Sequence, residues 1–241
     1  MKNKPPKLQH TIGLIAGTSL TRSELFSSWK TRQIKTVYGT VEVQRSGNII
    51  FLQRHGKTAS PPHMINHRAN IQAMKDLGAE KIIAVNSVGS LKTAFRPGSF
   101  IIPDDFISLW QIPTFFDGEM RFTVPEMDRR LGESLYTLCG EQTVRLHFGG
   151  TYVQTIGPRF ETKAEIRMLK NFGDAVGMTM ASEATLSMEQ GIPYASLCSI
   201  DNYCNGIIET PLTMEQIAES VGNNIKTIEG VINMLITRGL P

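Results

Sequence analysis

The sequence contains few cysteines and no long apolar run, and each shortage excludes a class of protein. Only Cys139, Cys198 and Cys204 occur among its 241 residues, and their odd number and spacing fit neither a disulfide framework nor a zinc knuckle. We expect three reduced thiols that pack in the interior. No apolar run approaches the roughly 18 residues of a membrane-spanning helix, and residues 1–10 lack the apolar centre of a signal peptide. The sequence therefore predicts a soluble, cytoplasmic protein.

The sequence also lacks a strong excess of charge of either sign. Lys and Arg number 25 against 22 Asp and Glu, which gives a net charge of +3. The two signs are interspersed along the chain and do not form the basic stripe that is typical of nucleic-acid binding. We therefore expect neither nucleic acid nor a membrane as a partner, whereas a small anion remains compatible with the balance.

Several common catalytic motifs are missing. No GxGxxG follows the first predicted strand, and the patterns GxxxxGK[ST], HExxH and GxSxG do not occur. These absences argue against a dinucleotide-binding fingerprint, a P-loop, a zinc protease helix and the nucleophile turn of the α/β-hydrolases.

The hydrophobic residues, 41% of the chain, are arranged in strand-like and helix-like segments that alternate. This alternation predicts a single α/β domain over residues 11–241, with a mixed central sheet flanked by helices and a flexible segment at 1–10. We predict strands at 11–17, 36–43, 49–54, 81–85, 98–107, 148–156, 174–177 and 193–200, of which the strand at 98–107 is interrupted by a proline. We predict helices at 66–77, 161–171, 181–190 and 213–235, with a break in the last near Gly222. A turn is expected at 86–90, and a surface loop with exposed rings at 110–127.

Polar residues follow several of the predicted strands. Thr18, Arg54, His55, Asn86 and Asn202 all lie at carboxyl ends of strands, where open α/β sheets bind ligands. A planar cation beside hydroxyl groups and free backbone amides suits an inorganic oxyanion. Each motif taken alone is more typical of an ordinary turn or a solvated pair, and only their joint placement at strand ends favours an anion site.

The segment Gly157-Pro158-Arg159-Phe160-Glu161-Thr162 places an aromatic ring and a carboxylate together just before a helix. A flat heterocycle that forms hydrogen bonds requires this combination. In the alternative interpretation, Glu161 only complements the dipole of the helix.

Taken together, these motifs resemble the trimeric purine nucleoside phosphorylase and methylthioadenosine phosphorylase family. The resemblance runs from Thr11 to Asn202 and includes, in the order of the family, GLIAGTSL, FLQRHG, NHRANIQAMKDLG, IIAVNSVGSL, PGSFIIPDDFI, GPRFETKAEI and AVGMTMASEATLSMEQGIPYASL. It implies the fold of that family and the reversible transfer of a pentose from a purine to phosphate. It also implies a homotrimer or a dimer of trimers, inorganic phosphate as co-substrate, and neither a metal ion nor an organic cofactor.

The resemblance also implies roles for single residues. Thr18, Arg54, His55, the backbone of Ser87, and Thr179 match phosphate-binding positions. Met178 lies against the ribose, Phe160 packs on the purine, His67 stands where a tyrosine commonly lies beside the ribose, and Phe122 reaches a neighbouring subunit. The positions expected to take part in catalysis are His55, Glu161 and Asn202, the last of which helps the base to leave through its N7.

The base-site residues predict which purine is bound. An ionised Glu161 accepts a hydrogen bond from the N1–H of a 6-oxopurine and repels the N1 lone pair of adenine, while the amide of Asn202 can donate towards O6. We therefore expect inosine and guanosine as substrates. Asp201, one residue earlier, would change this conclusion if the register of the strand were shifted by one.

Other functions remain open at this point. The apolar surface around Met214 suits a 5′-methylthio group, so 5′-methylthioinosine or 5′-methylthioadenosine is an alternative substrate. A non-catalytic nucleoside-binding protein and a nucleoside hydrolase that uses water are two further hypotheses, and both leave part of the anion-binding set without a role.

Overall fold

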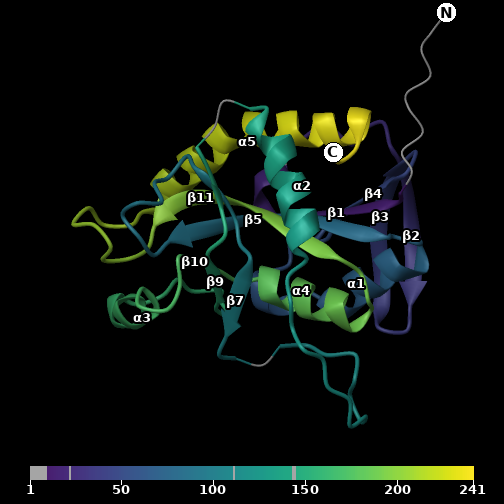
Figure 1. The fold of residues 1–241 in the computed structure, drawn as a ribbon, viewed down its shortest axis with the longest axis horizontal. Helices are drawn as coiled ribbons and strands as arrows, with labels where there is room; N and C mark the ends of the chain where they lie inside the picture. The colour runs from purple at the N-terminus through teal and green to yellow at the C-terminus, as the bar shows by residue number, and fades with distance from the viewer. Residues whose placement is uncertain (1–9, 22, 111, 143–144) are drawn as a thin grey trace, which may run out of the picture.

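The computed structural model describes residues 10–21, 23–110, 112–142 and 145–241 (Figure 1). Its strands are β1 (Ile12–Ala16), β2 (Lys30–Thr36), β3 (Gly39–Ser46), β4 (Ile49–Gln53), β5 (Lys81–Ser90), β6 (Phe100–Ile102), β7 (Asp105–Ser108), β8 (Leu146–Phe148), β9 (Thr151–Gln154), β10 (Ala175–Gly177) and β11 (Tyr194–Tyr203). Its helices are α1 (His67–Asp76), α2 (Arg129–Gly140), α3 (Lys163–Leu169), α4 (Met180–Glu189) and α5 (Met214–Arg238), with short 3₁₀ helices η1 (Thr18–Leu20) and η2 (Pro62–Met64). The predicted α/β class with a mixed sheet is confirmed.

The pairing of β5 creates the gap in which polar residues gather. Strands β4 and β11 run parallel to β1 and β5, so these four strands end at the same edge of the sheet. On one side of β5, residues 81–85 pair with β1, and residues 89–90 pair antiparallel with β10. Residues 86–88 have no partner strand on that side within the described chain. The segments that follow β1 and β4 converge on this gap.

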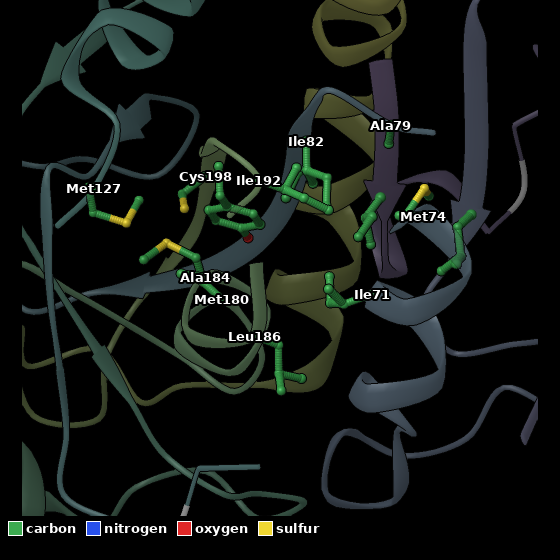
Figure 2. Close-up of a cluster of buried hydrophobic side chains, with 14 of the residues drawn as sticks. Ile71, Met74, Ala79, Ile82, Met127, Met180, Ala184, Leu186, Ile192 and Cys198 are labelled. Carbon is green, nitrogen blue, oxygen red and sulfur yellow. The ribbon is translucent and has the colours of Figure 1, made fainter. Parts of the chain in front are cut away.

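Two hydrophobic cores cover the two faces of the sheet, and Figure 1 shows α1 and α4 on one side and α2 and α5 on the other. Leu186 of α4 and Ile71 and Met74 of α1 belong to the first core, which Figure 2 displays. Leu135 of α2 and Ile232 of α5 belong to the second. Burial on both faces fixes the strands that carry the polar residues of the gap.

Most predicted elements overlap an observed element of the same type. These are the strands at 11–17, 49–54, 81–85, 174–177 and 193–200 and the helices at 66–77, 161–171, 181–190 and 213–235. The last helix continues through Gly222 without a break. Packing of its second half against the sheet outweighs the low helix propensity of one exposed glycine.

Several predictions on the strands were wrong. Residues 86–90 form no turn, because they continue β5 and pair with β11. The predicted interruption of the strand at 98–107 by a proline is confirmed, since β6 and β7 are separated at Pro103, whose missing N–H cannot join a ladder. The segment 148–156 is likewise divided into β8 and β9 by Gly149 and Gly150. The predicted strand at 36–43 is interrupted by the turn between β2 and β3.

Two elements escaped the sequence analysis. Strand β2 is mostly exposed and pairs along one side with β3, so its side chains carry little apolar alternation. Helix α2 buries Leu131, Leu135 and Leu138 on one stripe, a spacing that was available in the sequence. No helix within the described chain is long and apolar enough to cross a membrane.

The described residues of the predicted surface loop between β7 and α2 contain neither a helix nor a strand and extend away from the body of the protein (Figure 1). The expectation of several exposed rings was only partly correct. Phe122 is 87% exposed, but Phe115 packs against Tyr38 and the Arg121 guanidinium lies over the ring of Phe116. The expected flexibility of residues 1–10 concerns residues that lie, except for His10, outside the described range.

Candidate active site

A pocket of about 310 Å³ opens where β5 has no partner strand on one side within the described chain. Its walls come from the ends of β1, β4, β10 and β11, from the segment 158–161 and from the start of α5. Ten of the predicted site residues line it: Thr18, Arg54, His55, Ser87, Phe160, Glu161, Met178, Thr179, Asn202 and Met214. The pocket therefore brings together residues from seven separate parts of the sequence.

Arg54 is buried and firmly held at one end of this pocket. Its Nε and Nη2 donate to the two carboxylate oxygens of Glu183 at 2.6 and 3.1 Å, and its Nη1 donates to the carbonyl of Val85 at 2.8 Å. Glu183 also accepts from the hydroxyl of Tyr194 at 3.0 Å. The alternative of a solvated surface arginine is thereby excluded, because only 4% of the residue is exposed. Bonds from three directions fix the plane of the guanidinium.

Gly17 leaves room for this guanidinium. A Cβ at Gly17 would lie 2.4 Å from Nη1 of Arg54 and 3.2 Å from Nε2 of His55. Any side chain here would collide with the arginine. The two nitrogen atoms therefore face the same small volume above the Gly17 backbone, beside Thr18, which suits one oxyanion.

Two hydrogen bonds to Ser60 orient the ring of His55. Its Nδ1 lies 2.7 Å from the carbonyl oxygen of Ser60, and the N–H of Ser60 donates back to the carbonyl of His55 at 2.8 Å. Burial lowers the pKa of His55, and the nearby charge of Arg54 lowers it further. The carbonyl of Ser60 and the carboxylate of Glu183 oppose this shift. The ring is consequently fixed with Nε2 towards the pocket.

Thr179 precedes α4 and contributes a hydroxyl group. Its Oγ1 accepts a hydrogen bond from Nδ2 of Asn86 at 2.8 Å, so the hydroxyl proton remains free to donate into the pocket. Asn86 is oriented in turn by the hydroxyl of Ser196. The hydroxyl of Ser87 donates away from the pocket to Asp201, which leaves the backbone of Ser87 as its contribution to the lining.

The opposite part of the pocket carries a buried carboxylate. Glu161 is 7% exposed, and its Oε1 accepts from the hydroxyl of Thr155 at 2.6 Å. It lies just before the N-cap Thr162 of α3, whose capping box is made by Glu165. Glu161 is therefore not needed to begin the helix, and the alternative of a purely dipolar role is weakened. The ring of Phe160 stands beside it, 41% exposed.

A β-bulge decides which polar residue of β11 enters the pocket. The register of β11 against β5 shifts between Ile200 and Asn202, which places Asn202 opposite Gly89. Asp201 points away, and its carboxylate accepts from Nδ2 of Asn224 at 2.8 Å and from the hydroxyl of Ser87. Asn202 lines the pocket as predicted, and the register concern about Asp201 is resolved.

The side chains of Asn202 and Cys204 lie close to the backbone of Gly89 in this part of the pocket. A Cβ on Gly89 would lie 2.7 Å from Sγ of Cys204 and 3.0 Å from Nδ2 of Asn202. Asn202 gives one hydrogen bond to the carbonyl of Tyr203 at 3.0 Å, so one N–H and its Oδ1 remain for a ligand. Cys204 also lines the pocket, and burial raises the pKa of its thiol.

The third part of the pocket is apolar. Leu212 and three residues of α5, Met214, Ile217 and Val221, line it together with Pro62 of η2. Met214 is 62% exposed, so this wall faces solvent on its outer side. The described residues that line this part offer no charged group.

Two predicted residues lie outside this pocket. His67 lines a neighbouring cavity that shares Pro62 and Met178 with it. Burial lowers the pKa of His67 to about 4, and its Nδ1 has no hydrogen-bond partner among the described residues. His67 is therefore a buried side chain and not a surface histidine. Phe122 lies on the extended loop and is not part of either cavity.

The sequence analysis missed Glu183 and Cys204. Glu183 is fully buried on α4 among small and apolar residues, with the next carboxylate of the helix at its last residue, Glu189. A carboxylate in such surroundings signals a buried partner. Cys204 carried no comparable signal, because nothing in its sequence spacing places it in the pocket beside Asn202, after the bulge of β11. No group of three or more His, Cys, Asp or Glu residues within the described chain is arranged to hold a metal ion.

Comparison with known proteins agrees with this geometry. Residues 11–237 match the phosphorylase superfamily. The chain is 38% identical over 221 residues to a probable 6-oxopurine nucleoside phosphorylase of Archaeoglobus fulgidus, covering 89% of this chain and 91% of the relative. It is 40% identical over 234 residues to a probable S-methyl-5′-thioinosine phosphorylase of Methanocaldococcus jannaschii, covering 92% of each. Methylthioadenosine phosphorylase from Schistosoma mansoni, solved in complex with adenine, has a TM-score of 0.81 at 26% identity, covering 93% of this chain and 90% of that chain.

Proposed function

The chain belongs to the phosphorylase superfamily, and from this premise we propose that it catalyses the reversible phosphorolysis of 6-oxopurine nucleosides. Inosine or guanosine and inorganic phosphate give the free purine and ribose 1-phosphate. The observation that carries the proposal is one pocket with an oxyanion site at one end and the buried Glu161 carboxylate beside Asn202 at the other. The Archaeoglobus relative named above supports the same substrate class.

The chemistry follows from the charges that develop in the reaction. When the bond between C1′ and N9 breaks, positive charge builds on the sugar and negative charge on the base. A phosphate held by Arg54, Thr18 and Thr179 stabilises the sugar cation and then attacks C1′. Because the guanidinium is already fixed by Glu183, the phosphate is aligned before the reaction begins.

Departure of the base depends on the other end of the pocket. Asn202 keeps one N–H for N7 or O6 of the purine, where negative charge accumulates. Glu161 keeps Oε2 for the N1–H of a 6-oxopurine, since Oε1 is occupied by Thr155. Adenine presents an N1 lone pair at that point and leaves the carboxylate unpaired, which disfavours it.

The test measures base release from inosine, guanosine and adenosine with and without phosphate. We expect hypoxanthine and guanine only when phosphate is present, and little adenine. Release without phosphate would support the hydrolase hypothesis. Binding of inosine without release under either condition would support the non-catalytic hypothesis, and a preference for adenosine would contradict the assigned role of Glu161.

A second candidate function is the phosphorolysis of 5′-methylthioinosine. The apolar wall formed by Leu212, Met214, Ile217 and Val221 favours a methylthio group over a hydroxyl group at the 5′ position. The Methanocaldococcus relative supports it as well. A comparison of kcat/KM for inosine, 5′-methylthioinosine and 5′-methylthioadenosine distinguishes these substrates, because the first two differ only at the 5′ position.

The assembly that we propose is a homotrimer, or a dimer of trimers, in which the extended loop completes the pocket of a neighbour. Met120, Phe122 and Val124 alternate along this loop and are 87–94% exposed, which is unusual for apolar side chains without a partner. Sedimentation measurements combined with activity at decreasing protein concentration test it. An active monomer would contradict the role of Phe122.

We propose further that the reaction needs neither a metal ion nor an organic cofactor and takes place in the cytoplasm. The polar groups that line the pocket supply the required charges by themselves. The buried free thiols Cys139, Cys198 and Cys204 agree with a reducing compartment. Activity that is lost on treatment with a chelator and restored by a metal ion would contradict the first part. Fractionation of cells tests the second.

A further inference from the structure

The hydrogen bond between His55 and Ser60 fixes the tautomer of the imidazole. A backbone carbonyl oxygen can only accept, so the Nδ1 that lies 2.7 Å from it must carry the hydrogen. In the neutral ring, Nε2 is then a bare acceptor. The return bond from the N–H of Ser60 to the carbonyl of His55 holds the loop in this arrangement.

Burial and the neighbouring charge of Arg54 keep the ring of His55 neutral. Desolvation lowers its pKa, and the guanidinium of Arg54, the preceding residue, acts in the same direction. Glu183 on α4 opposes the shift, but its carboxylate is bound to Arg54. His67 on α1 is held neutral by burial, since its pKa is lowered to about 4. The ring of His55 therefore stays uncharged at neutral pH.

An acceptor and a donor thus stand side by side at the anion site. Nε2 of His55 and Nη1 of Arg54 lie 3.2 and 2.4 Å from the position that a Cβ of Gly17 would occupy. Every other predicted partner of the anion donates a hydrogen bond: the guanidinium, the hydroxyl groups of Thr18 and Thr179, and the N–H of Ser87. Nε2 of His55 alone can accept a hydrogen bond but has no hydrogen to donate.

We propose that His55 makes this site selective for oxyanions that carry a proton. Monohydrogen phosphate or arsenate donates its O–H to Nε2, while its ionised oxygens accept from Arg54 and the hydroxyl groups. Sulfate has the same tetrahedral shape and the same double negative charge, but it has no proton at neutral pH. It places an oxygen lone pair against the lone pair of Nε2, which leaves both groups unpaired. The inference rests on the proposed function, because it takes this end of the pocket as the phosphate site.

The selectivity must depend on pH in one direction. Protonation of His55 turns Nε2 into a donor, so sulfate gains a partner as the pH falls below the pKa of the ring. That pKa lies below the usual 6.5. Phosphate keeps at least one proton throughout, so its binding changes less.

The experiment titrates the full chain with phosphate, arsenate and sulfate by calorimetry at pH 7.5 and at pH 5.5. We expect sulfate to bind at least about tenfold more weakly than phosphate at pH 7.5, arsenate to match phosphate, and the difference to narrow at pH 5.5. Equal affinities for sulfate and phosphate at pH 7.5 would overturn the inference. Calorimetry needs no turnover, so a chain that discriminates the anions but releases no base would fail the proposed function alone.

Two variants assign the effect to one side chain. His55→Gln offers an amide N–H in place of the lone pair, and we expect it to bind sulfate at least about tenfold more tightly relative to phosphate than the wild type does. The control is His63→Gln, an exposed histidine on η2 that does not line the pocket. It should keep the wild-type ratio. A His55→Gln variant with an unchanged ratio would assign the discrimination to another group and contradict the inference.

Discussion

The two ends of the pocket are built in different ways. At the proposed phosphate end, Arg54 and Thr179 are less than 10% exposed, and each is hydrogen-bonded to a second buried side chain, Glu183 or Asn86. At the 5′ end, the lining consists of apolar side chains such as Met214, which is 62% exposed. A transition state with charge on phosphate and sugar demands fixed dipoles, whereas the size of a 5′ substituent needs only a fitting surface. In the proposed reaction, the first end therefore holds the charged reacting groups, and the second selects the 5′ substituent.

The largest expected effect concerns the phosphate end. Glu183→Gln leaves the buried Arg54 without its counter-charge, and we expect the free energy of unfolding to fall by about 3 to 5 kcal/mol. Chemical denaturation measures it. The control is Glu133→Gln, which removes an exposed pair with Arg129 on α2 and should change stability little.

A double variant sharpens this result. Arg54→Met combined with Glu183→Leu removes both charges, so it should be more stable than either single variant while lacking phosphate-dependent activity. If the double variant loses the sum of the two single effects, the pair is not coupled as the geometry indicates.

The next largest effect concerns Asp201, whose carboxylate accepts hydrogen bonds from Ser87 of β5 and from Asn224 of α5. Burial raises its pKa to about 7, against the favourable hydrogen bond from Asn224, while the unfolded chain titrates near 3.8. Between these values the unfolded state binds fewer protons than the folded state, so the wild type loses stability as the pH rises from about 4 to about 7. The Asp201→Asn variant should not lose stability in this way, because its side chain does not titrate.

Denaturation of both proteins between pH 4.5 and pH 8 checks this expectation. The stability of the wild type relative to Asp201→Asn should fall by up to a few kcal/mol up to about pH 7 and then stay constant. Asp76→Asn, at an exposed position of α1, serves as the control. A relative stability that increases with pH would show that Asp201 is ionised in the folded chain.

At the base end, Glu161→Gln removes the charge that accepts from the N1–H of a 6-oxopurine. We expect kcat/KM for inosine to fall by roughly 100-fold, with a smaller change for adenosine. Glu165→Gln is the matched control, because that carboxylate caps α3 and binds Arg159 outside the pocket. Equal losses for both nucleosides would remove Glu161 from base recognition.

The smallest expected effect lies at the 5′ end. Ile217→Asn places an amide in the apolar wall, and kcat/KM for 5′-methylthioinosine should fall about tenfold relative to that for inosine. Ile225→Asn, two turns further along α5 and outside the pocket, should leave the ratio unchanged. A larger fall in kcat/KM for inosine than for 5′-methylthioinosine would show that the 5′ group binds elsewhere.

The fold class was predictable because periodicity is a local property. The stripe that predicts α1 and the apolar run that predicts β1 depend only on neighbouring residues. The proline in the strand predicted at 98–107 gave the interruption, but it did not predict where the two parts pair. These parts, β6 and β7, pair with different partners, β11 and β9, and pairing across the sheet is not recorded in a local pattern.

The candidate site was predictable to the extent that its residues follow strands. Arg54 and His55 follow β4 and face the end of β1, because parallel strands end at one edge of the sheet. The prediction placed His67 beside the ribose, but its position on α1 directs the side chain into the neighbouring cavity. Glu183 lies 129 residues from Arg54, and no spacing in the sequence connects them.

The sequence by itself determined the alternation of strands and helices and the chemical types that meet at the strand ends, because both depend on residue identity and short-range order. The tertiary structure alone decided that Asn202 rather than Asp201 enters the pocket and that Arg54 is held by Glu183. A bulge of one residue and an ion pair between distant segments arise from packing of the whole chain, which fixes direction and distance where composition cannot.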